Sequence, residues 1–173
     1  MLKAGNEVTV RWMYSIVNVA WEAGSVPEDW RKALVIPVHK KGSKMQCTNY
    51  RGISLLSIPG KVYARILDYK VRDITEGKVL EEQEAFRKKN RSCVDQMFTV
   101  RQLGEKIIKK NKRMVMMCVD LKKAYDRVDR EMLWQVLDSY GVGGRLGRAV
   151  RSLYERCQAC VRVLGPKFRL VRS

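Results

Sequence analysis

Asp120 is the residue of this sequence best suited to metal chemistry, because it directly follows the apolar run MVMMCV at residues 114–119. A carboxylate at the end of a buried strand would be held rigidly while its oxygens stay at the surface, as a metal ligand requires. Two-metal phosphoryl transfer uses carboxylates that bridge ions roughly 4 Å apart. The Leu121 carbonyl could supply another oxygen, and Tyr125 could lie against whatever the metal binds.

Taken alone, this pattern is weak, because an aspartate that ends a strand is more often a turn former or a helix cap. Asp126 and Asp129 fit those structural roles, the first within a turn and the second as the N-cap of the next helix. The CQAC motif at residues 157–160 has metal-ligand spacing, but there is no second cysteine pair and His39 is the one histidine. We therefore expect no zinc site and five free thiols.

The charge balance favours a polyanionic partner. The chain carries 35 Lys and Arg residues against 18 Asp and Glu, a formal net charge of +17. Such an excess suits nucleic acid, because every phosphate that is neutralised releases condensed counterions. An anionic membrane surface, or a basic surface without a partner, would also satisfy it. No run reaches the length of a transmembrane helix, and we expect an intracellular protein, cytoplasmic or nuclear, without a membrane partner.

The elements that must position these residues are helices and strands in irregular order. The run at 113–120 predicts a strand covered on both faces, and Pro37 predicts an edge position or a strand end for the strand at 33–38. Four residues should form the apolar side of the first helix, namely Val8, Trp12, Ile16 and Val19. The fold class is α+β. Helices are expected at about 8–23, 59–74, 93–110, 129–140 and up to 156, and strands at 33–38, 49–57, 113–120 and in a hairpin at 159–171 with its turn at Gly165-Pro166.

Four blocks of the sequence, in order, resemble the reverse transcriptase domain of non-LTR (LINE-type) retrotransposons. The block at 26–44 resembles the opening of that domain, and the block at 49–67 resembles its fingers segment with a Tyr-Arg-x-Ile-Ser-Leu core. The block at 80–98 resembles the segment that usually reads Gln-x-Gly-Phe-Arg, and 119–134 resembles polymerase motif A. Four blocks in the expected order are far more specific than any one of them. The blocks read VPEDWRKALVIPVHKKGSK, NYRGISLLSIPGKVYARIL, LEEQEAFRKKNRSCVDQMF and VDLKKAYDRVDREMLW.

The resemblance implies a right-hand polymerase, with residues 1–112 as fingers and fingers/palm helices and 113–173 as the first part of an incomplete palm. It also implies roles for nine residues. Asp120 would be the catalytic carboxylate and, with the Leu121 carbonyl, would hold Mg²⁺, while Tyr125 would exclude a 2′-hydroxyl and so select deoxynucleotides. The expected nucleotide-binding residues are Lys40, Arg51 and Tyr125, and those expected to contact nucleic acid are Lys41, Arg87, Arg91 and Ser92.

Departures from the family pattern leave three functions open. Ala85 stands where the family usually has Gly, and the sequence contains no Gly-rich motif B, paired-aspartate motif or thumb. One motif A carboxylate cannot hold two ions against a triphosphate. The first hypothesis is therefore part of an RNA-directed DNA polymerase that uses Mg²⁺, dNTP, a DNA primer and an RNA template, inactive as this fragment. The second is a non-catalytic module that binds RNA or a hybrid, and the third is a relic without function.

Overall fold

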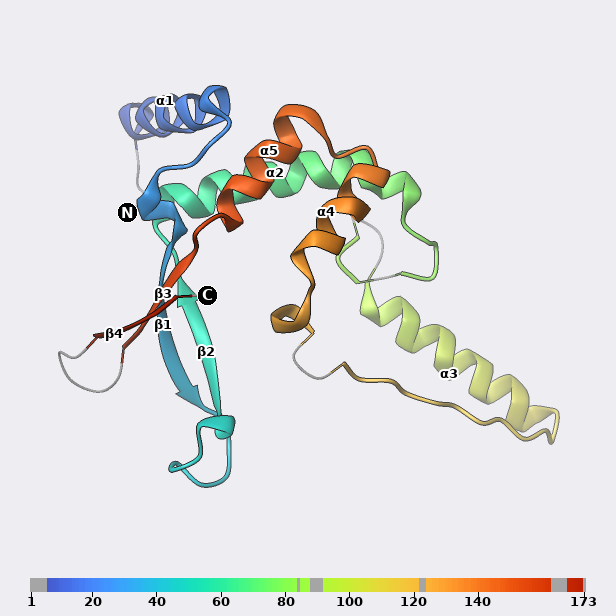
Figure 1. Cartoon of the computed structure of the whole chain (residues 1–173). Coiled ribbons are helices and arrows are strands. Elements are labelled where there is room, and N and C mark those ends of the chain that lie inside the picture. Colours follow the sequence, from blue (N-terminus) through green and yellow to red (C-terminus); the bar gives the residue numbers. More distant parts are fainter. Residues whose placement is uncertain (1–5, 84, 88–91, 122–123, 163–167, 173) are drawn as a thin grey trace. The chain divides into compact units, whose positions relative to one another are not determined.

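In the computed structural model, the chain forms two compact units (Figure 1). The first comprises residues 1–70 and 143–173, and the second comprises residues 71–142. These boundaries differ from the fingers and palm ranges expected from the resemblance, whose assignment stays a prediction. The structure describes residues 6–83, 85–87, 92–121, 124–162 and 168–172.

A four-stranded sheet forms one layer of the first unit, in the order β2-β1-β3-β4. Strand β1 pairs antiparallel with β2 and parallel with β3, and β3 pairs antiparallel with β4. The hairpin expected at the C-terminal end is thus confirmed, and its turn at Gly165-Pro166 lies outside the described residues. The strands are β1 (Lys32–His39), β2 (Tyr50–Leu55), β3 (Gln158–Arg162) and β4 (Phe168–Arg172).

Among the described residues, Pro37 has a strand partner on the β2 side of β1. The pairing of β1 with β3 runs from Lys32 to Val35, whereas the pairing with β2 continues to His39, with Pro37 opposite Gly52. Proline has no backbone N–H to donate, so it belongs where the ladder on one side has ended. Strand β3 is described only as far as Arg162, so the edge or strand-end position expected for Pro37 stays a prediction.

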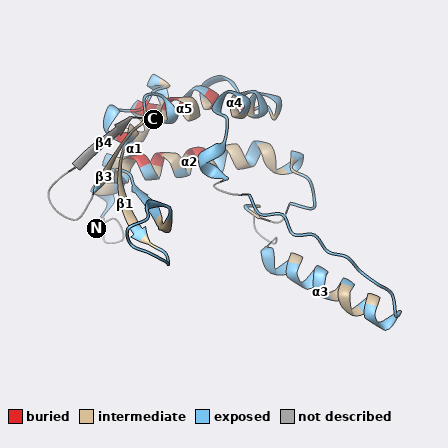
Figure 2. Cartoon of the chain, turned by 60° about the horizontal axis from the view of Figure 1, so that its bottom comes forward, coloured by how far each residue is buried: buried red, intermediate tan, exposed pale blue. Residues whose placement is uncertain are grey.

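The apolar core of the first unit lies between helices and the segment that leads into β1. Trp30 and Tyr63 are buried, with ring centroids 5.4 Å apart, and Leu67 and Ala149 pack in the same cluster. Most of the buried positions in Figure 2 lie on helices. The elements concerned are α1 (Glu7–Ala23), the short helix η2 (Glu28–Arg31), the first part of α2 (Ile58–Thr75) and α5 (Gly144–Tyr154); a further short helix, η3 (Cys47–Asn49), precedes β2.

Helix α1 buries a different face from the one its sequence indicated. Ile16 packs against the core as expected, but Val8, Trp12 and Val19 are exposed, and the buried residue of the helix is Ala20. Apolar side chains lie around most of this helix, so periodicity did not identify one face. The small side chain of Ala20 allows the helix backbone to approach the core closely, which explains the face that is chosen.

The C-terminal end of α1 is fixed by a glycine and by arginines of α5. Gly24 adopts φ +63° and its N–H donates to the carbonyl of Trp21, as expected for a helix stop. The guanidinium of Arg145 donates to both carboxylate oxygens of Glu22 at 3.0 Å. The Arg148 Nε lies 3.8 Å from where a Cβ on Gly24 would stand. These cations complement the negative end of the α1 dipole.

The second unit is built from helices with defined N-caps and little apolar core. Ser92 and Asp95 form a capping box that starts α3, and Asp129 caps α4 by accepting from the Met132 N–H at 3.1 Å, as its sequence predicted. Val142 is fully buried. The elements after α2 are η4 (Glu76–Lys78), α3 (Cys93–Lys109), η5 (Tyr125–Arg127) and α4 (Arg130–Ser139).

The strand expected at 113–120 is absent, and this prediction was wrong. In the structure the segment has no regular secondary structure and all eight residues are exposed, Val115 at 95% and Met117 at 84%. A β-strand needs a neighbouring strand to satisfy its backbone groups, and no described segment pairs with this one. The apolar run at 113–120 therefore forms no β-strand, although its composition suits one.

Tyr63 supplies a test of the core, because its hydroxyl is buried without a hydrogen-bond partner in the described part of the chain. We expect Tyr63→Phe to raise the free energy of unfolding by about 1 kcal/mol, since an unsatisfied polar group is removed and the ring is kept. Tyr50→Phe is the matched control and should lower it by a similar amount, because that hydroxyl donates to the Lys44 carbonyl at 2.9 Å.

Urea unfolding below and above pH 10 measures both effects. Burial raises the pKa of the Tyr63 phenol above its ordinary value of 10.0. Above that pH the unfolded chain loses the phenolic proton while the folded chain keeps it, so this group lowers stability as the pH rises. The Tyr63→Phe chain should therefore lose less stability in alkali than the parent. A Tyr63→Phe chain that is less stable than the parent at neutral pH would show that the hydroxyl is satisfied.

Candidate active site

The β1–β2 hairpin places two of the expected nucleotide-binding cations on one face. His39 pairs with Tyr50 and Val38 with Arg51, and the Lys40 N–H continues the ladder by donating to the Asn49 carbonyl at 2.8 Å. In this register Lys40 and Arg51 are diagonal neighbours on the same face of the hairpin, and both are exposed. Lys41, the next residue, has no strand partner and is also exposed.

The loop of this hairpin is held by side-chain contacts that the sequence did not reveal. The Asn49 side-chain amide donates to the Ser43 carbonyl at 2.9 Å, and the Tyr50 hydroxyl donates to the Lys44 carbonyl. Gly42 has φ +83°, and a Cβ there would meet the Asn49 amide nitrogen at 2.8 Å. The loop between the strands is therefore a defined turn that displays basic residues, with glycine required at Gly42.

The motif A residues lie in the second unit and face solvent. Asp120 and Leu121 are exposed and belong to no helix or strand, and Tyr125 begins η5 with 81% of its surface exposed. Within the described residues no group of three or more His, Cys, Asp or Glu side chains could hold a metal ion. These residues by themselves do not fit a two-ion centre, and Asp120 would be one ligand among others.

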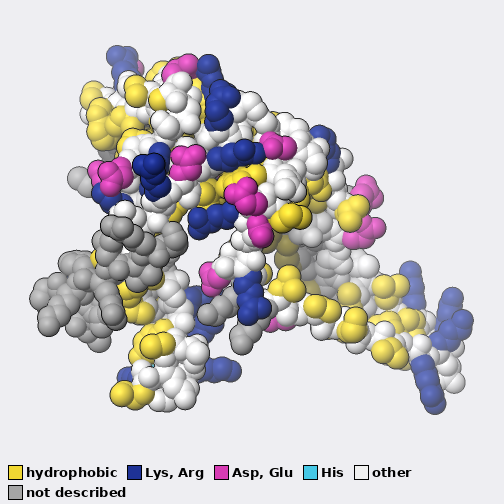
Figure 3. Space-filling view, viewed as in Figure 1, with side chains coloured by type: hydrophobic (Ala, Val, Ile, Leu, Met, Phe, Trp, Pro, Cys, Tyr) yellow, Lys and Arg dark blue, Asp and Glu magenta, His cyan; other side chains and the backbone are white. Residues whose placement is uncertain are grey.

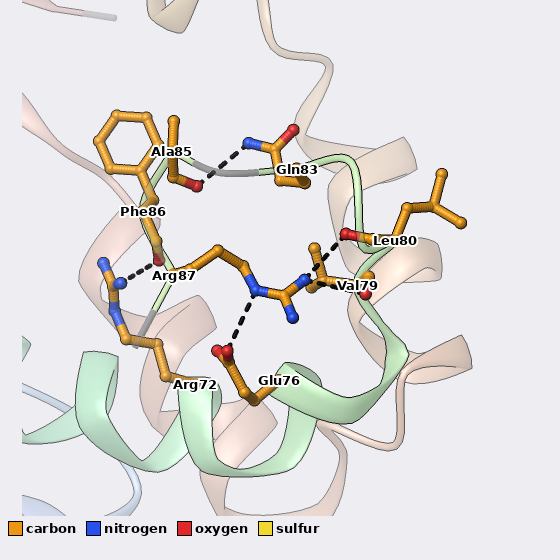
Figure 4. A network of polar contacts seen from close by, with 8 residues as sticks. All are labelled: Arg72, Glu76, Val79, Leu80, Gln83, Ala85, Phe86 and Arg87. Atoms are coloured by element: carbon orange, nitrogen blue, oxygen red, sulfur yellow. Dashed lines mark hydrogen bonds and ion pairs between the residues drawn. The ribbon is translucent and has the colours of Figure 1, made fainter. Parts of the chain in front are cut away.

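Arg87 lies at the centre of a turn that its own guanidinium holds together (Figure 4). Its Nε donates to the Glu76 carboxylate at 3.1 Å, and one terminal nitrogen donates to the carbonyls of Val79 and Leu80, each at 2.9 Å. The Arg87 side chain is only 10% exposed. The structure thus gives Arg87 an internal role, and its expected contact with the template stays a prediction.

The same turn contains Phe86 and Ala85, the alanine that stands where the family usually has Gly. Phe86 has φ +62°, and the Arg72 guanidinium donates to its carbonyl. Among the described residues of this turn, Phe86 is in the left-handed region. The Gln83 side-chain amide donates to the Ala85 carbonyl at 3.2 Å. A cavity of about 410 Å³ lies beside the turn, lined in part by Thr75, Glu76, Phe86 and Tyr140.

Ser92 and Arg91 are the other two residues that were expected to contact nucleic acid in this region, and the structure describes Ser92. The Ser92 N–H and hydroxyl both donate to the Asp95 carboxylate, at 2.8 and 3.0 Å, so the serine serves the N-cap of α3. Arg91 lies outside the described residues. The expected sites therefore form two groups: Lys40, Lys41 and Arg51 in the first unit, and Arg87, Ser92, Asp120, Leu121 and Tyr125 in the second.

Two general expectations can also be compared with the structure. All five cysteines are free thiols, as the sequence indicated. Within the described residues, no helix combines the length and the apolar character needed to cross a bilayer.

Comparison with known protein families identifies the family of this chain. Residues 38–169 match the family described as reverse transcriptase (RNA-dependent DNA polymerase). This match covers most of the chain and includes both groups of expected site residues. The chain belongs to the reverse transcriptase family, as the four sequence blocks implied.

Curated relatives come from transposons. The chain is 23% identical over 150 residues to "Transposon TX1 uncharacterized 149 kDa protein" of Xenopus laevis, covering 87% of this chain. It is 26% identical over 129 residues, 73% of this chain, to "Probable RNA-directed DNA polymerase from transposon BS" of Drosophila melanogaster. The chain spans 11% and 14% of the lengths of these two proteins. The chain thus matches a short part of each of these two transposon proteins.

Arg87→Ala tests whether the arginine serves the turn or the template. We expect the free energy of unfolding to fall by about 3 kcal/mol, because Glu76 and two carbonyls lose a nearly buried charged partner. Arg101→Ala is the matched control: its pair with Glu105, at 3.0 Å, is exposed, so the loss should stay below about 1 kcal/mol.

Urea unfolding and RNA retention on a filter, measured on both variants, separate the two roles. A turn role predicts loss of stability from Arg87→Ala, with hydrogen exchange accelerated around residues 76–87. If Arg87→Ala unfolds like the parent but retains less RNA, the arginine faces the template and not the turn.

Proposed function

We propose that this chain is part of an RNA-directed DNA polymerase, and that its hairpin cations bind the triphosphate of an incoming nucleotide. The observation that carries the proposal is the family match over residues 38–169, which spans Lys40, Arg51, Asp120 and Tyr125. Lys40 and Arg51 lie on one face of the hairpin, where two cations can address one polyphosphate. Arginine grips phosphate oxygens with a planar fork, while lysine acts as a point charge.

The hairpin register also distinguishes Lys40 from Lys41. Side chains alternate between faces along a strand, so Lys40 shares the face of Arg51 whereas Lys41 follows it into the loop. We assign Lys40 to the nucleotide and Lys41 to the nucleic-acid backbone. The side chains of Asn49 and Tyr50 hold the loop by hydrogen bonds, so both lysines stay near the strand ends. This order lowers the entropy that is lost on binding.

Asp120 is the residue we assign to the metal, with Mg²⁺ as the proposed ion and the Leu121 carbonyl as a neighbouring oxygen. Mg²⁺ prefers oxygen ligands and is commonly held by one or two carboxylates together with substrate phosphates. Tyr125 follows in the same exposed segment, and its ring is free to lie beneath a bound sugar. We assign it the selection of deoxynucleotides, with RNA template and DNA primer as the other partners.

A non-catalytic RNA-binding module is the second candidate. It is favoured by the absence of a three-ligand group among the described residues, together with the net charge of +17. Both candidates share the basic surface and differ in whether nucleotide transfer occurs. In both, the 173-residue chain alone is expected to hold RNA and not to extend a primer.

Primer extension on an RNA template with dNTPs and Mg²⁺, using the purified 173-residue chain, tests this expectation. We expect no extension above that of an Asp120→Ala chain, but retention of RNA that weakens as salt increases. Asp120→Ala should retain RNA as well as the parent or better, because it removes a negative charge near the phosphates. Extension that Asp120→Ala abolishes would show that the chain itself provides the remaining ligands.

Nucleotide binding tests the hairpin assignment independently of catalysis. We expect Arg51→Ala to raise the Kd for a fluorescent dNTP about tenfold, the effect of losing one charge-assisted hydrogen bond to phosphate. Lys40→Ala should raise it by less, and Lys41→Ala should leave it unchanged. Arg65→Ala is the control, because that exposed arginine pairs with Asp68 on α2.

Fluorescence anisotropy at fixed ionic strength gives these constants. Equal Kd values for the parent and Arg51→Ala would show that the hairpin does not bind the nucleotide. A larger effect from Lys41→Ala than from Lys40→Ala would contradict the assignment made from the register.

A further inference from the structure

Five cations gather at the C-terminal tip of α3, which we call the α3 tip. They occur within eight residues, KIIKKNKR, and are Lys106, Lys109, Lys110, Lys112 and Arg113. All five are exposed. In Figure 3, Lys and Arg side chains gather at this free end of α3. The tip holds the densest group of positive charge in the described second unit and includes none of the residues assigned to the nucleotide or the metal.

The end of the helix has a geometry that holds these cations together. Asn111 adopts φ 49°, its N–H donates to the Ile108 carbonyl at 2.9 Å, and the Lys112 N–H donates to the Ile107 carbonyl at 3.1 Å. These two bonds form a Schellman motif with a left-handed asparagine. The chain reverses sharply at this point, as Figure 1 shows, so the residues after the helix stay beside its last turn.

The charges of the α3 tip are not neutralised within the protein. In the described part of the chain, none of the five has an ion pair with an acidic side chain, whereas Arg101 one turn earlier pairs with Glu105. The carbonyl end of α3 provides partial negative charge that favours cations there, but it offsets only part of five full charges. Holding five like charges together costs free energy, which a polyanionic ligand would recover.

We propose that the α3 tip is a binding site for the phosphodiester backbone of a nucleic-acid duplex, separate from the nucleotide and metal residues. Four of the five cations are lysines, which address phosphates as point charges and carry no base-reading geometry. Binding at this tip is therefore independent of sequence and common to RNA and DNA. The choice of nucleic acid as the partner rests on the proposed function, whereas the positive site itself rests on the structure alone.

A membrane surface fits the tip less well. An interfacial helix needs one continuous apolar face beside its basic face. One row of exposed apolar side chains on α3, formed by Val94, Phe98 and Ile108, is interrupted by the Arg101–Glu105 pair, which would have to leave water. Glu105 would also be repelled by anionic lipid. Binding to nucleic acid requires only the cations, so nucleic acid is the partner assigned here. Lipid binding is the alternative that the experiment distinguishes.

The test compares two variants of the 173-residue chain that remove the same charge. Lys109→Gln with Lys110→Gln removes two cations of the α3 tip, and Gln keeps nearly the helix propensity of Lys. Lys61→Gln with Lys70→Gln removes two exposed cations of α2 as the matched control. Lys109→Arg with Lys110→Arg retains the charge. Far-ultraviolet circular dichroism verifies that all variants fold.

Fluorescence anisotropy with a labelled 16-base-pair duplex, at 50–300 mM salt, measures the Kd and its salt dependence. We expect the glutamine pair at the tip to weaken binding about tenfold near 100 mM salt, with a slope shallower by about 0.9 for each phosphate that is no longer neutralised. The control pair should change the Kd less than threefold, and the arginine pair should bind like the parent. RNA, DNA and hybrid duplexes should respond alike.

Three results would overturn the proposal. Equal losses of affinity in the tip and control variants would mean that binding follows overall charge and not this site. An unchanged Kd in the tip variant would show that the α3 tip does not bind the duplex. Unchanged duplex binding together with lost binding to phosphatidylserine vesicles would identify lipid as its partner.

The dNTP titration keeps this proposal separate from the proposed function. If Arg51 governs dNTP binding and the tip variant binds duplex normally, only the tip proposal fails. If the tip governs duplex binding and Arg51→Ala has no effect on dNTP, only the nucleotide assignment fails.

Discussion

The packing of Trp30 against Tyr63 is the contact on which the first unit depends. Trp30 lies in η2, directly before β1, and Tyr63 lies in α2, which follows β2. The aromatic pair therefore anchors both ends of the β1–β2 hairpin to one core, with ring centroids 5.4 Å apart. Gly60 permits this approach, because a Cβ there would stand 3.3 Å from the Trp30 side chain. Lys40 and Arg51 lie at the end of the hairpin that is far from this buried pair.

The second unit is held largely by polar contacts. Arg87 joins Glu76 to two backbone carbonyls, Arg72 holds the Phe86 carbonyl, and the Lys78 ammonium donates to the Tyr140 carbonyl at 2.6 Å. A helix without buried residues, such as α3, gains little from tertiary packing and relies on its capping box and its Schellman end. The same scarcity of packing leaves the α3 tip, Asp120 and Tyr125 in solvent, where ligands can reach them.

Most elements could be predicted because their signals are local. The N-cap at Asp129 and the stop at Gly24 depend on backbone chemistry within a few residues, and both are confirmed. The family also follows from sequence, since four ordered blocks are specific even at 23–26% identity to the curated relatives. The residues that hold the hairpin loop and the Arg87 turn were not identified, because side-chain bonds to backbone carbonyls leave no periodic pattern.

The sequence by itself determined the reverse transcriptase family, the mixed α+β class, the limits of most helices and strands, and the excess of positive charge. These properties depend on motifs, local propensities and composition. Only the tertiary structure decided which face of α1 is buried, that residues 113–120 form no strand, and that Arg87 is engaged inside a turn. It also decided that Lys40 shares a face with Arg51 and that the chain doubles back at Asn111 to form the α3 tip. The reversal at Asn111 rests on backbone bonds within five residues, but each of the others depends on which groups farther along the chain supply a partner, and no local pattern contains that information.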